Sequence, residues 1–501
     1  MKKRVQAILA VMLLSSAFLA ACSGKESGST GPEPSDNTND KPYEIVLAYP
    51  GVETPDVALV QDEMNKLIED KIGATVKLLP INWGAWGQQM NLMLSSKEKL
   101  DIIFVSGEEY AARVAKGQLV ELNDLLARSG KDIVDAIGSD YLNATKINGK
   151  IYALPSIRDF AAGSGILMRK DLVDKYKIDV GSIKTFEDLS QVFKIIKENE
   201  PGVSPLVPQA GGGSTYTFTD LMNASDFDTL GDSMGVLPDL DNHLKVVNLF
   251  ENAKYRERLN LVREWYLNGY IPKDAATTKD FAATLISAGK AFAYFDRTKP
   301  NVVAQESANA GQQLIGIPFT PPSTQTSIIT ALMQGIAQNS NNPEKALQFL
   351  NLLYSDSKLL NLLDYGIEGK HYVIKGDVIG YPEGTTAETV GYTNTSLLFG
   401  NQFISYVFEG NDPDVWEQVE EFNKSAVKSK ALGFSFDVEP VKTEAAAVTN
   451  VFNQYKGGLE NGVLDPNVTL PVFIDKLKAA GLDEIIAEKQ KQLDVWAASN
   501  P

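Results

Sequence analysis

The sequence predicts an α/β protein of two lobes, with a hinge and an interlobe cleft and a helix-rich C-terminal part. Three observations predict this fold class. The chain has 501 residues, of which 44% are hydrophobic, and this is enough for about two to three domains at roughly 150 residues each. Short apolar strands alternate with amphipathic helical stretches in the first part of the chain. A more helical region follows, and a buried strand returns near residue 330.

The region after residue 42 predicts a parallel sheet. Apolar segments at 44–49, 75–79 and 101–105 have the length and composition of strands. Between the first two, Thr54 and Pro55 mark the start of a helix whose apolar residues recur at helical spacing. Strands that alternate with helices form a parallel sheet with helices on both faces.

A second lobe is predicted to begin at a strand at 163–168, and the strand predicted at 330–337 returns to the first sheet. A chain that passes between two lobes several times forms a hinge and leaves a cleft. We therefore expect an N-terminal α/β lobe from residues 42–157 and about 298–360, and a C-terminal helix-rich lobe from residues 158–297 and about 361–500.

The first residues carry a targeting signal. Three basic residues at positions 2–4 precede an apolar stretch that ends in Leu19-Ala20-Ala21-Cys22, and this pattern resembles a bacterial lipobox. The resemblance implies a signal peptide over 1–21, a lipidated Cys22, and membrane anchoring by diacylglycerol and fatty acids such as palmitate. A plain secretory signal and a transmembrane anchor are the alternatives. Residues 22–41 contain no aliphatic or aromatic side chain and predict a flexible tether.

Composition argues against several classes of function. The chain has 47 basic and 64 acidic residues, and its net charge of −17 repels phosphate backbones, so we expect no nucleic-acid partner. With one cysteine and two histidines, a disulfide framework, an iron–sulfur cluster and a Cys/His zinc site are not expected. We expect no metal site and no cofactor.

Several stretches along the chain carry a family resemblance. The most specific are Tyr365-Gly-Ile-Glu-Gly-Lys-His-Tyr372 and Gly433-Phe-Ser-Phe-Asp437, and the others lie at 81–94, 117–122, 148–155 and 265–271. In these stretches the chain resembles the extracellular solute-binding lipoproteins of carbohydrate ABC importers, in a subgroup of large lipoproteins that take up oligosaccharides. The resemblance implies a two-lobed, periplasmic-binding-protein-like (type II) fold.

The resemblance also implies a function. It implies a lipid-anchored receptor on the extracellular face of the cell membrane, which captures an oligosaccharide and delivers it to ABC permease subunits without enzymatic activity. We expect a monomer. A receptor for a peptide or another small solute is one alternative, and a surface polysaccharide-degrading enzyme is another. Some relatives carry an Asp/Asn-rich calcium loop, but residues 198–205 hold too few carboxylates, so no calcium is expected there.

A sugar receptor needs aromatic platforms for the C–H faces of the ring and polar groups for its hydroxyls. Side chains at predicted strand ends, near the hinge or in aromatic pairs are the candidate ligand-binding residues: Trp83, Trp86, Glu108, Tyr152, Arg158, Trp265, Tyr294 and Asp296. Core packing is the alternative for the tryptophans, and an ion pair with Asp159 is the alternative for Arg158. No catalytic residue is expected, because Glu368 and His371 are predicted to make structural hydrogen bonds.

Overall fold

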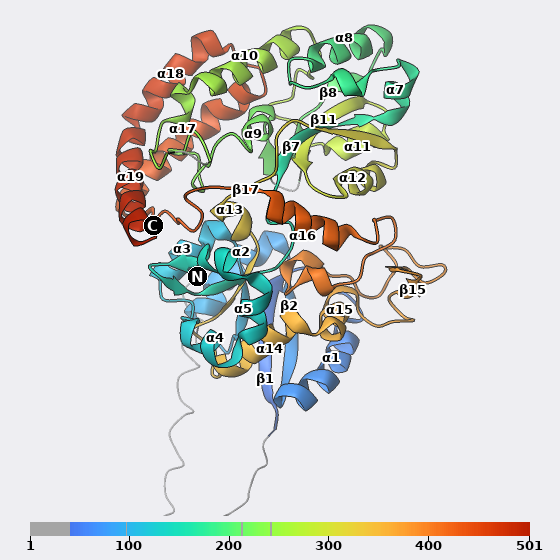
Figure 1. Cartoon of the computed structure of the whole chain (residues 1–501), viewed down its shortest axis with the longest axis vertical. Helices are drawn as coiled ribbons and strands as arrows, with labels where there is room; N and C mark the ends of the chain where they lie inside the picture. The colour runs from blue at the N-terminus through green and yellow to red at the C-terminus, as the bar shows by residue number, and fades with distance from the viewer. Residues whose placement is uncertain (1–40, 97, 212–213, 241–242, 501) are drawn as a thin grey trace, which may run out of the picture. The chain divides into compact units, whose positions relative to one another are not determined.

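Two β-sheets form the centres of two lobes (Figure 1). The computed structural model describes residues 41–96, 98–211, 214–240 and 243–500. The predicted signal peptide, the Cys22 lipidation site and the predicted tether up to residue 40 lie outside the described residues. Pro42–Pro501 form one unit. In the described part of the chain, no helix is long and apolar enough to cross a membrane.

The first sheet has the strand order β2-β1-β3-β14-β6. β1 pairs in parallel with β2 and β3, as predicted, whereas β14 runs antiparallel between β3 and β6. Leu47, Ile103 and Leu350 are fully buried in the core between this sheet and its helices. The strands are β1 (Tyr43–Pro50), β2 (Ala74–Ile81), β3 (Ile102–Val105), β6 (Ala153–Pro155) and β14 (Met333–Ile336). The helices are α1 (Val57–Ile72), α2 (Trp83–Ser95), α3 (Gly107–Ala115), α4 (Asn123–Ser129), α5 (Lys131–Ile137), α6 (Ser139–Asn143), α14 (Pro343–Ser355) and α15 (Ser357–Tyr365).

The second sheet has the order β12-β7-β11-β8. Because side chains alternate along a strand, Phe295 and Tyr294 of β11 enter different cores. Phe295 packs with Phe193 of α8 and Trp265 of α10, whereas Tyr294 lies on the face covered by α11 and α12. The elements are β7 (Gly163–Arg169), β8 (Ser204–Leu206), β11 (Ala291–Thr298), β12 (Leu314–Pro318), α7 (Lys170–Lys175), α8 (Leu189–Asn199), α9 (Phe218–Asn223), α10 (Ala253–Leu267), α11 (Ala282–Ser287) and α12 (Val302–Ala310).

The C-terminal part is helical, as predicted. Helices α17 (Lys442–Glu460), α18 (Pro466–Ala479) and α19 (Leu482–Ser499), red in Figure 1, pack together and against α10. Phe250 and Phe473 are buried in the core that these helices share. Small separate hairpins are β4 (Lys146–Ile147) with β5 (Lys150–Ile151), β9 (Gln209–Gly211) with β10 (Ser214–Tyr216), and β15 (Val373–Lys375) with β16 (Val378–Gly380).

The lobe boundaries differ from the sequence prediction in two places. The prediction assigns about 298–360 to the first lobe, but β12 hydrogen-bonds along β7 in the second sheet. It assigns the chain after about residue 361 to the second lobe, but Leu363 of α15 and Phe399 belong to the core of the first. Both segments are apolar, and an apolar pattern predicts burial without showing which core receives it.

Three segments connect the lobes and pair with one another. They are residues 156–162, residues 319–329 with β13 (Ser323–Thr324) and α13 (Thr326–Ile329), and a third segment with α16 (Val415–Ser425) and β17 (Val427–Lys428). Ala162 bridges to Ser323, and β13 pairs in parallel with β17. These connections form the predicted hinge region, in which short pairings replace a continuous sheet.

The buried side chain of Asn423 ties α16 to the first connecting segment. Its Oδ1 accepts a hydrogen bond from the Phe160 backbone N–H at 2.8 Å, and its Nδ2 donates to the Arg158 carbonyl at 2.8 Å. Asn423 is 4% exposed, so water cannot replace these bonds. Loss of the amide would leave two buried backbone groups without partners.

We therefore predict that Asn423→Ala lowers the free energy of unfolding by about 2–4 kcal/mol. Urea unfolding of the purified protein measures the change. Asn199→Ala is the matched control, because Asn199 is exposed and its side chain bonds only to the Ile195 carbonyl of its own helix. Equal stability of the two variants would contradict the role given to Asn423.

Candidate functional site

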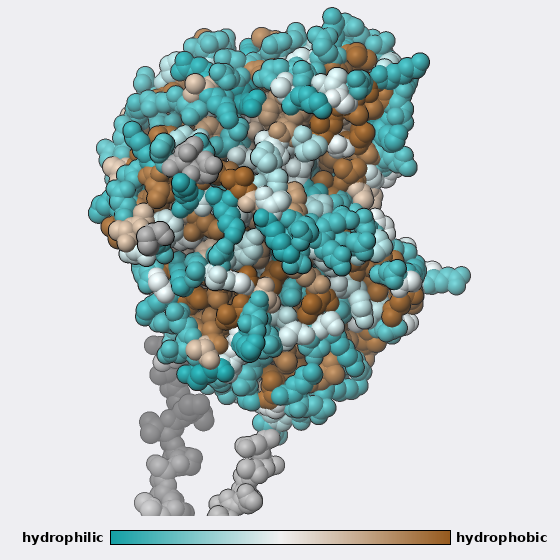
Figure 2. Space-filling model, in the orientation of Figure 1, coloured by the Kyte–Doolittle hydropathy of each residue, from teal (hydrophilic) through white to brown (hydrophobic). Residues whose placement is uncertain are grey.

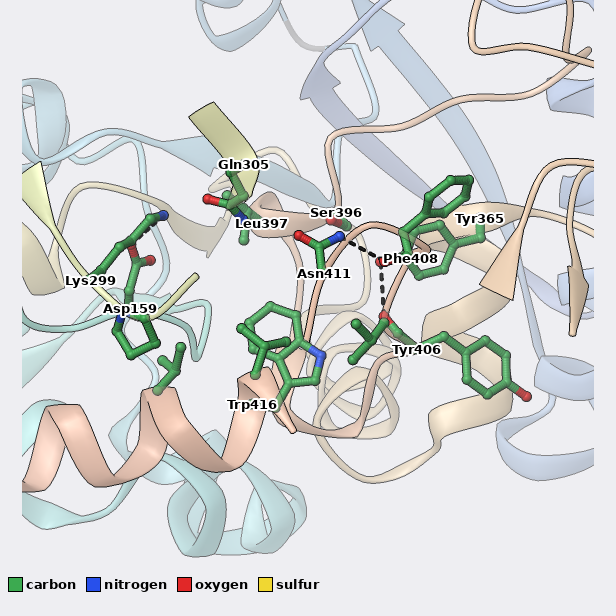
Figure 3. Close-up of a pocket in the computed structure, with 14 residues that line it drawn as sticks. Asp159, Lys299, Gln305, Tyr365, Ser396, Leu397, Tyr406, Phe408, Asn411 and Trp416 are labelled. Atoms are coloured by element: carbon green, nitrogen blue, oxygen red, sulfur yellow. Dashed lines mark hydrogen bonds and ion pairs between the residues drawn. The ribbon is translucent and has the colours of Figure 1, made fainter. Parts of the chain in front are cut away.

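A cavity of about 210 Å³ lies beside the connecting segments. Its lining comes from both lobes (Figure 3): Lys299 and Gln305 follow β11 in the second lobe, whereas Tyr365 and Ser396 belong to the first. Trp416 is contributed by α16, which belongs to the third connecting segment. A cavity lined in this way changes shape when the lobes move relative to each other.

One end of the cavity is polar and is organised by Asp159. The carboxylate accepts a hydrogen bond from Arg158 Nη1 at 2.9 Å and from Lys299 Nζ at 2.8 Å. Burial on its own would raise the pKa of Asp159, but the charges of Lys299 and Arg158 outweigh burial and hold this pKa below its usual value. The carboxylate therefore stays ionised, and the Lys299 ammonium keeps N–H groups available for a ligand.

Gln305 adds an uncommitted amide to the polar end. Its side chain is exposed and makes no hydrogen bond with any residue that the structure describes. It lies on α12, which packs against β12 of the second sheet. This amide can both donate and accept hydrogen bonds, which suits it to ligand hydroxyl or amide groups.

The other end of the cavity is aromatic. The rings of Tyr365 and Phe408 lie 6.2 Å apart, and the Tyr365 hydroxyl donates to the Tyr406 carbonyl at 3.1 Å. The indole N–H of Trp416 donates to the Ser405 carbonyl at 3.1 Å, which fixes the orientation of the ring. In Figure 3 Trp416 lies between the Asp159–Lys299 pair and the tyrosine cluster. These rings can stack against the C–H face of a sugar.

A buried carboxyl group supports this aromatic end. Asp364 accepts hydrogen bonds from Ser405 Oγ at 2.8 Å and from Gln402 Nε2 at 3.2 Å. Burial raises the pKa of Asp364 well above its ordinary value. These two hydrogen bonds tie α15 to the loop that carries Tyr406 and Phe408, while the other carboxyl oxygen of Asp364, Oδ1, is buried without a partner among the described residues.

None of the eight ligand residues predicted from the sequence lines the cavity. Arg158 comes nearest, since it holds Asp159, and the ion pair considered as its alternative role is present. Trp83 is 53% exposed at the start of α2, and Glu108 is exposed in the first turn of α3. Tyr152 is half-buried beside β6. The described residues that line the cavity do not include these side chains.

Two of the predicted residues are core residues and leave the set of ligand candidates. Trp265 is fully buried, packs against Phe193, and donates its indole N–H to Ser190. Tyr294 is fully buried and donates its hydroxyl to Glu306 at 2.6 Å. Both side chains fill the space between the second sheet and its helices, where no ligand has room.

Trp86 is also packed in a core, and core packing is the alternative that was given for the tryptophans. It is 5% exposed, and its ring meets Phe104 of β3 edge-on at 5.8 Å.

Glu368 and His371 were both predicted to make structural hydrogen bonds, and His371 makes them. Its Nδ1 accepts from the Ile367 N–H, and its Nε2 lies 3.1 Å from Asp56. Glu368 is exposed.

The sequence reasoning missed the residues that line the cavity. Tyr365 lay inside the motif used for the family resemblance, but Tyr406, Phe408 and Trp416 were not singled out. Their signal is an aromatic-rich stretch after a Gly-Asn turn at 400–401, in a region without clear strand or helix periodicity. Such a loop is the usual place for binding residues on a rigid scaffold.

Comparison with known proteins identifies the family. The model for "Bacterial extracellular solute-binding protein" matches residues 57–358, and a domain of unknown function matches residues 430–498. The chain is 31% identical over 508 residues to a carbohydrate ABC transporter substrate-binding protein of Streptococcus pneumoniae serotype 4 (strain ATCC BAA-334 / TIGR4), covering 98% of each protein. The chain belongs to the bacterial extracellular solute-binding protein family. This confirms the family resemblance seen in the sequence.

Solved structures of another solute-binding protein share this fold. The crystal structure of the N-glycan transport solute binding protein (NgtS) from Streptococcus pneumoniae is 28% identical, with a TM-score of 0.81 over 92% of this chain and 100% of that chain. The same protein in complex with Man5GlcNAc, also 28% identical, gives a TM-score of 0.70 over 92% of this chain and 99% of that chain. The predicted two-lobed, type II-like fold is confirmed.

Asp296, another predicted ligand residue, lies in an environment that raises the pKa of its carboxyl group. Burial raises the pKa of Asp296 to about 6, and Glu306 adds to this shift, while a hydrogen bond from the Arg297 N–H and the charge of Lys299 oppose it. In the unfolded chain the group titrates near 3.9. The folded state therefore binds the proton more tightly, and its stability falls as the pH rises from about 4 to about 6.

We predict that Asp296→Asn stabilises the protein by about 1–2 kcal/mol at pH 7.5 and that this gain vanishes near pH 4. Asparagine keeps an acceptor for the Arg297 N–H but carries no charge. Thermal and urea unfolding at the two pH values provide the test. Asp280→Asn, at an exposed aspartate of the same lobe, should change little at either pH. A gain that is the same at both pH values would refute the burial argument.

Proposed function

We propose that this chain captures an oligosaccharide between its two lobes and delivers it to the permease of an ABC transporter. The observation that carries the proposal is the cavity itself, because both lobes contribute to it and it combines Trp416 and Tyr365 with the donors Lys299 and Gln305. Sugars present C–H faces that stack on aromatic rings and hydroxyls that need hydrogen-bond partners. A peptide or another small solute does not require this combination of aromatic rings and hydrogen-bond donors.

The comparisons support the same function. The relative in Streptococcus pneumoniae is a carbohydrate ABC transporter substrate-binding protein, and NgtS has been crystallised with Man5GlcNAc. This chain is more similar to the structure of NgtS itself than to its glycan complex, with TM-scores of 0.81 and 0.70. We propose that the ligand stabilises a closed arrangement of the two lobes over an open one.

The proposal includes attachment to the membrane. Cys22 stands where a lipobox places the lipidated residue, directly after Leu19-Ala20-Ala21. Lipid chains at Cys22 would hold the receptor at the outer face of the cell membrane, beside the permease that it serves. A monomer is sufficient for this role, since each chain carries a complete cavity.

We predict that Trp416→Ala weakens oligosaccharide binding by about ten- to a hundred-fold, because a stacking surface is lost. Calorimetry with a panel of neutral oligosaccharides measures affinity, and small-angle scattering measures closure. Phe281→Ala removes an exposed aromatic ring that does not line the cavity and should leave the affinity unchanged. Absence of binding to every glycan, with unchanged scattering, would exclude a sugar receptor.

The anchor has its own test. In cells that receive labelled palmitate, the wild-type chain should become labelled and sediment with the membrane fraction. Cys22→Ser removes the only thiol in the chain, so the variant should lose both the label and the membrane association. Ser23→Ala, one residue later, is the matched control. Membrane association that survives Cys22→Ser would point to a different anchor.

A further inference from the structure

A group of charged and polar side chains is buried in the second lobe and does not line the cavity. Hydrophilic residues cover much of the visible surface of this lobe, where charged groups meet water (Figure 2). Glu460, the last residue of α17, differs from them because its side chain is 1% exposed. We call the group around it the Glu460 cluster, which consists of Glu460, Lys456, Asp220, Tyr255 and Thr217.

The Glu460 cluster joins three helices of the second lobe. Oε2 of Glu460 accepts a hydrogen bond from Thr217 Oγ1 at 2.6 Å and lies 2.9 Å from Lys456 Nζ. Oε1 accepts from the Tyr255 hydroxyl at 2.8 Å. Thr217 is the N-cap residue of α9, and Tyr255 belongs to α10. One carboxylate therefore holds α17, α10 and the start of α9 together.

The cluster contains one cation for two carboxylates. Lys456 Nζ bonds to both oxygens of Asp220, at 2.6 and 2.8 Å, as well as to Glu460. The Asp220 side chain is 32% exposed, so water stabilises its charge, whereas water does not reach Glu460. When both carboxylates are ionised, the cluster carries an excess negative charge on the buried Glu460, which is unfavourable in a protein interior.

Protonation of Glu460 removes this excess charge. Burial raises the pKa of Glu460 to about 7, and the charge of Asp220 adds to the shift, while the charge of Lys456 and the hydrogen bond from Thr217 oppose it. The carboxyl group therefore changes its charge near neutral pH.

The other ionisable groups that face Glu460 keep their charge in this pH range. Burial on its own would lower the pKa of Lys456, but the two carboxylates outweigh burial and raise it, so Lys456 stays charged. Burial raises the pKa of Tyr255 well above its ordinary value, so the phenol stays neutral. Arg263 of α10 is always charged, and it donates to the carbonyls of Gly462 and Val463, just after Glu460, at 2.9 and 3.0 Å.

Helix α9 connects the Glu460 cluster to the second connecting segment. In Figure 1 this helix lies between α17 and the strands β7 and β11, and it packs against all three. At its far end, the Ala224 carbonyl accepts a hydrogen bond from Gln325 Nε2 at 3.3 Å, and the Ser225 hydroxyl accepts one from Thr320 Oγ1 at 3.0 Å. Gln325 and Thr320 both belong to the second connecting segment, so a shift of α9 is transmitted to the hinge region.

The same helix supports the strand that leads to the cavity. The rings of Phe218 in α9 and Phe295 in β11 lie 6.3 Å apart. Lys299, at the polar end of the cavity, follows β11 directly. Displacement of α9 therefore loosens the support of Lys299 as well as the hinge region.

The direction of the pH effect follows from linkage. A glutamate in water titrates near 4.3. The arrangement with α9 docked, in which Glu460 is buried, therefore binds the proton more tightly than an arrangement in which water reaches the carboxyl group. As the pH rises from about 4.3 to about 7, the docked arrangement loses stability relative to the hydrated one.

We propose that the Glu460 cluster is a pH-sensitive switch, in which protonated Glu460 keeps α9 docked against α17 and ionised Glu460 admits water and releases the start of α9. Release leaves Lys299 and the second connecting segment less ordered, and a less ordered site binds its ligand more weakly. The receptor therefore binds more tightly at mildly acidic pH than at neutral pH. This effect on binding rests on the proposed function, whereas the switch itself does not.

Hydrogen exchange on the ligand-free, full-length chain tests the switch. After correction for the intrinsic pH dependence of exchange, the amides of residues 217–225 should lose about ten-fold in protection between pH 5.5 and pH 7.5. The amides of α8, in the same lobe, are the internal reference and should not show this loss. Glu460→Gln, which cannot ionise, should give residues 217–225 equal protection at both pH values.

Tyr255→Phe provides a second variant that keeps the charge of Glu460. It removes a donor to the ionised carboxylate, so residues 217–225 should lose about three-fold more protection than in the wild type. Glu484→Gln is the matched control, because Glu484 is exposed on α19, and it should keep the wild-type pH dependence. Equal protection of residues 217–225 at both pH values in the wild type, or a loss that persists in Glu460→Gln, overturns the switch.

Calorimetry with Man5GlcNAc, the glycan of the NgtS complex, tests the effect on binding. The wild type should bind about three- to ten-fold more tightly at pH 5.5 than at pH 7.5, and Glu460→Gln should bind equally at both. An affinity of the wild type that is independent of pH overturns the effect on binding. Absence of binding to Man5GlcNAc and to a panel of neutral oligosaccharides at both pH values overturns the proposed function, while hydrogen exchange still decides on the switch.

Discussion

The fold depends on how the first connecting segment satisfies its buried polar groups. Asp159 binds two cations that come from different parts of the chain, Arg158 beside it and Lys299 after β11. Arg158 also donates to the Ile328 carbonyl of the second connecting segment at 2.9 Å. The Asp159 carboxylate therefore ties the first connecting segment to the second lobe and positions Arg158, which reaches the second connecting segment. Without it, two cations would be left partly buried and unpaired, which is costly in a protein interior.

The pairing of buried polar groups through side chains also explains why the connecting segments can bend. Within each sheet, backbone ladders fix the relative angle of the strands. Between the sheets, side chains carry much of the bonding: Asn423 holds two backbone groups of the first connecting segment, and Thr324 donates its hydroxyl to the Phe160 carbonyl. Side-chain bonds tolerate changes in backbone dihedral angles better than a ladder does, so rotation at a hinge can occur while these groups stay paired.

The sequence predicted local structure and family better than it predicted the site. Periodicity was sufficient for β1 to β3 and for the C-terminal helices, because their signals are local. It could not place β12, since its pairing with β7 joins segments about 150 residues apart in the sequence. Nor could it tell which of Trp265 and Tyr266 is fully buried, because the two residues are adjacent on α10 and both continue the apolar spacing from Leu259 and Val262. The cavity was missed for the same reason, because residues between Asp159 and Val419 meet there only after folding.

The division of the cavity between the lobes determines what a ligand can do. When Lys299 and Gln305 are separated from Tyr365, a sugar can satisfy only one half of its surface, so an open form binds weakly. In the closed form both halves of the sugar surface have partners, so the ligand binds the closed form more tightly than the open form. A population shift from mostly open to mostly closed needs about 5.5 kcal/mol of such difference. A few hydrogen bonds to charged or amide groups and one stacked ring are of this order, so under the proposed function a sugar that contacts both lobes at this position is enough to drive closure.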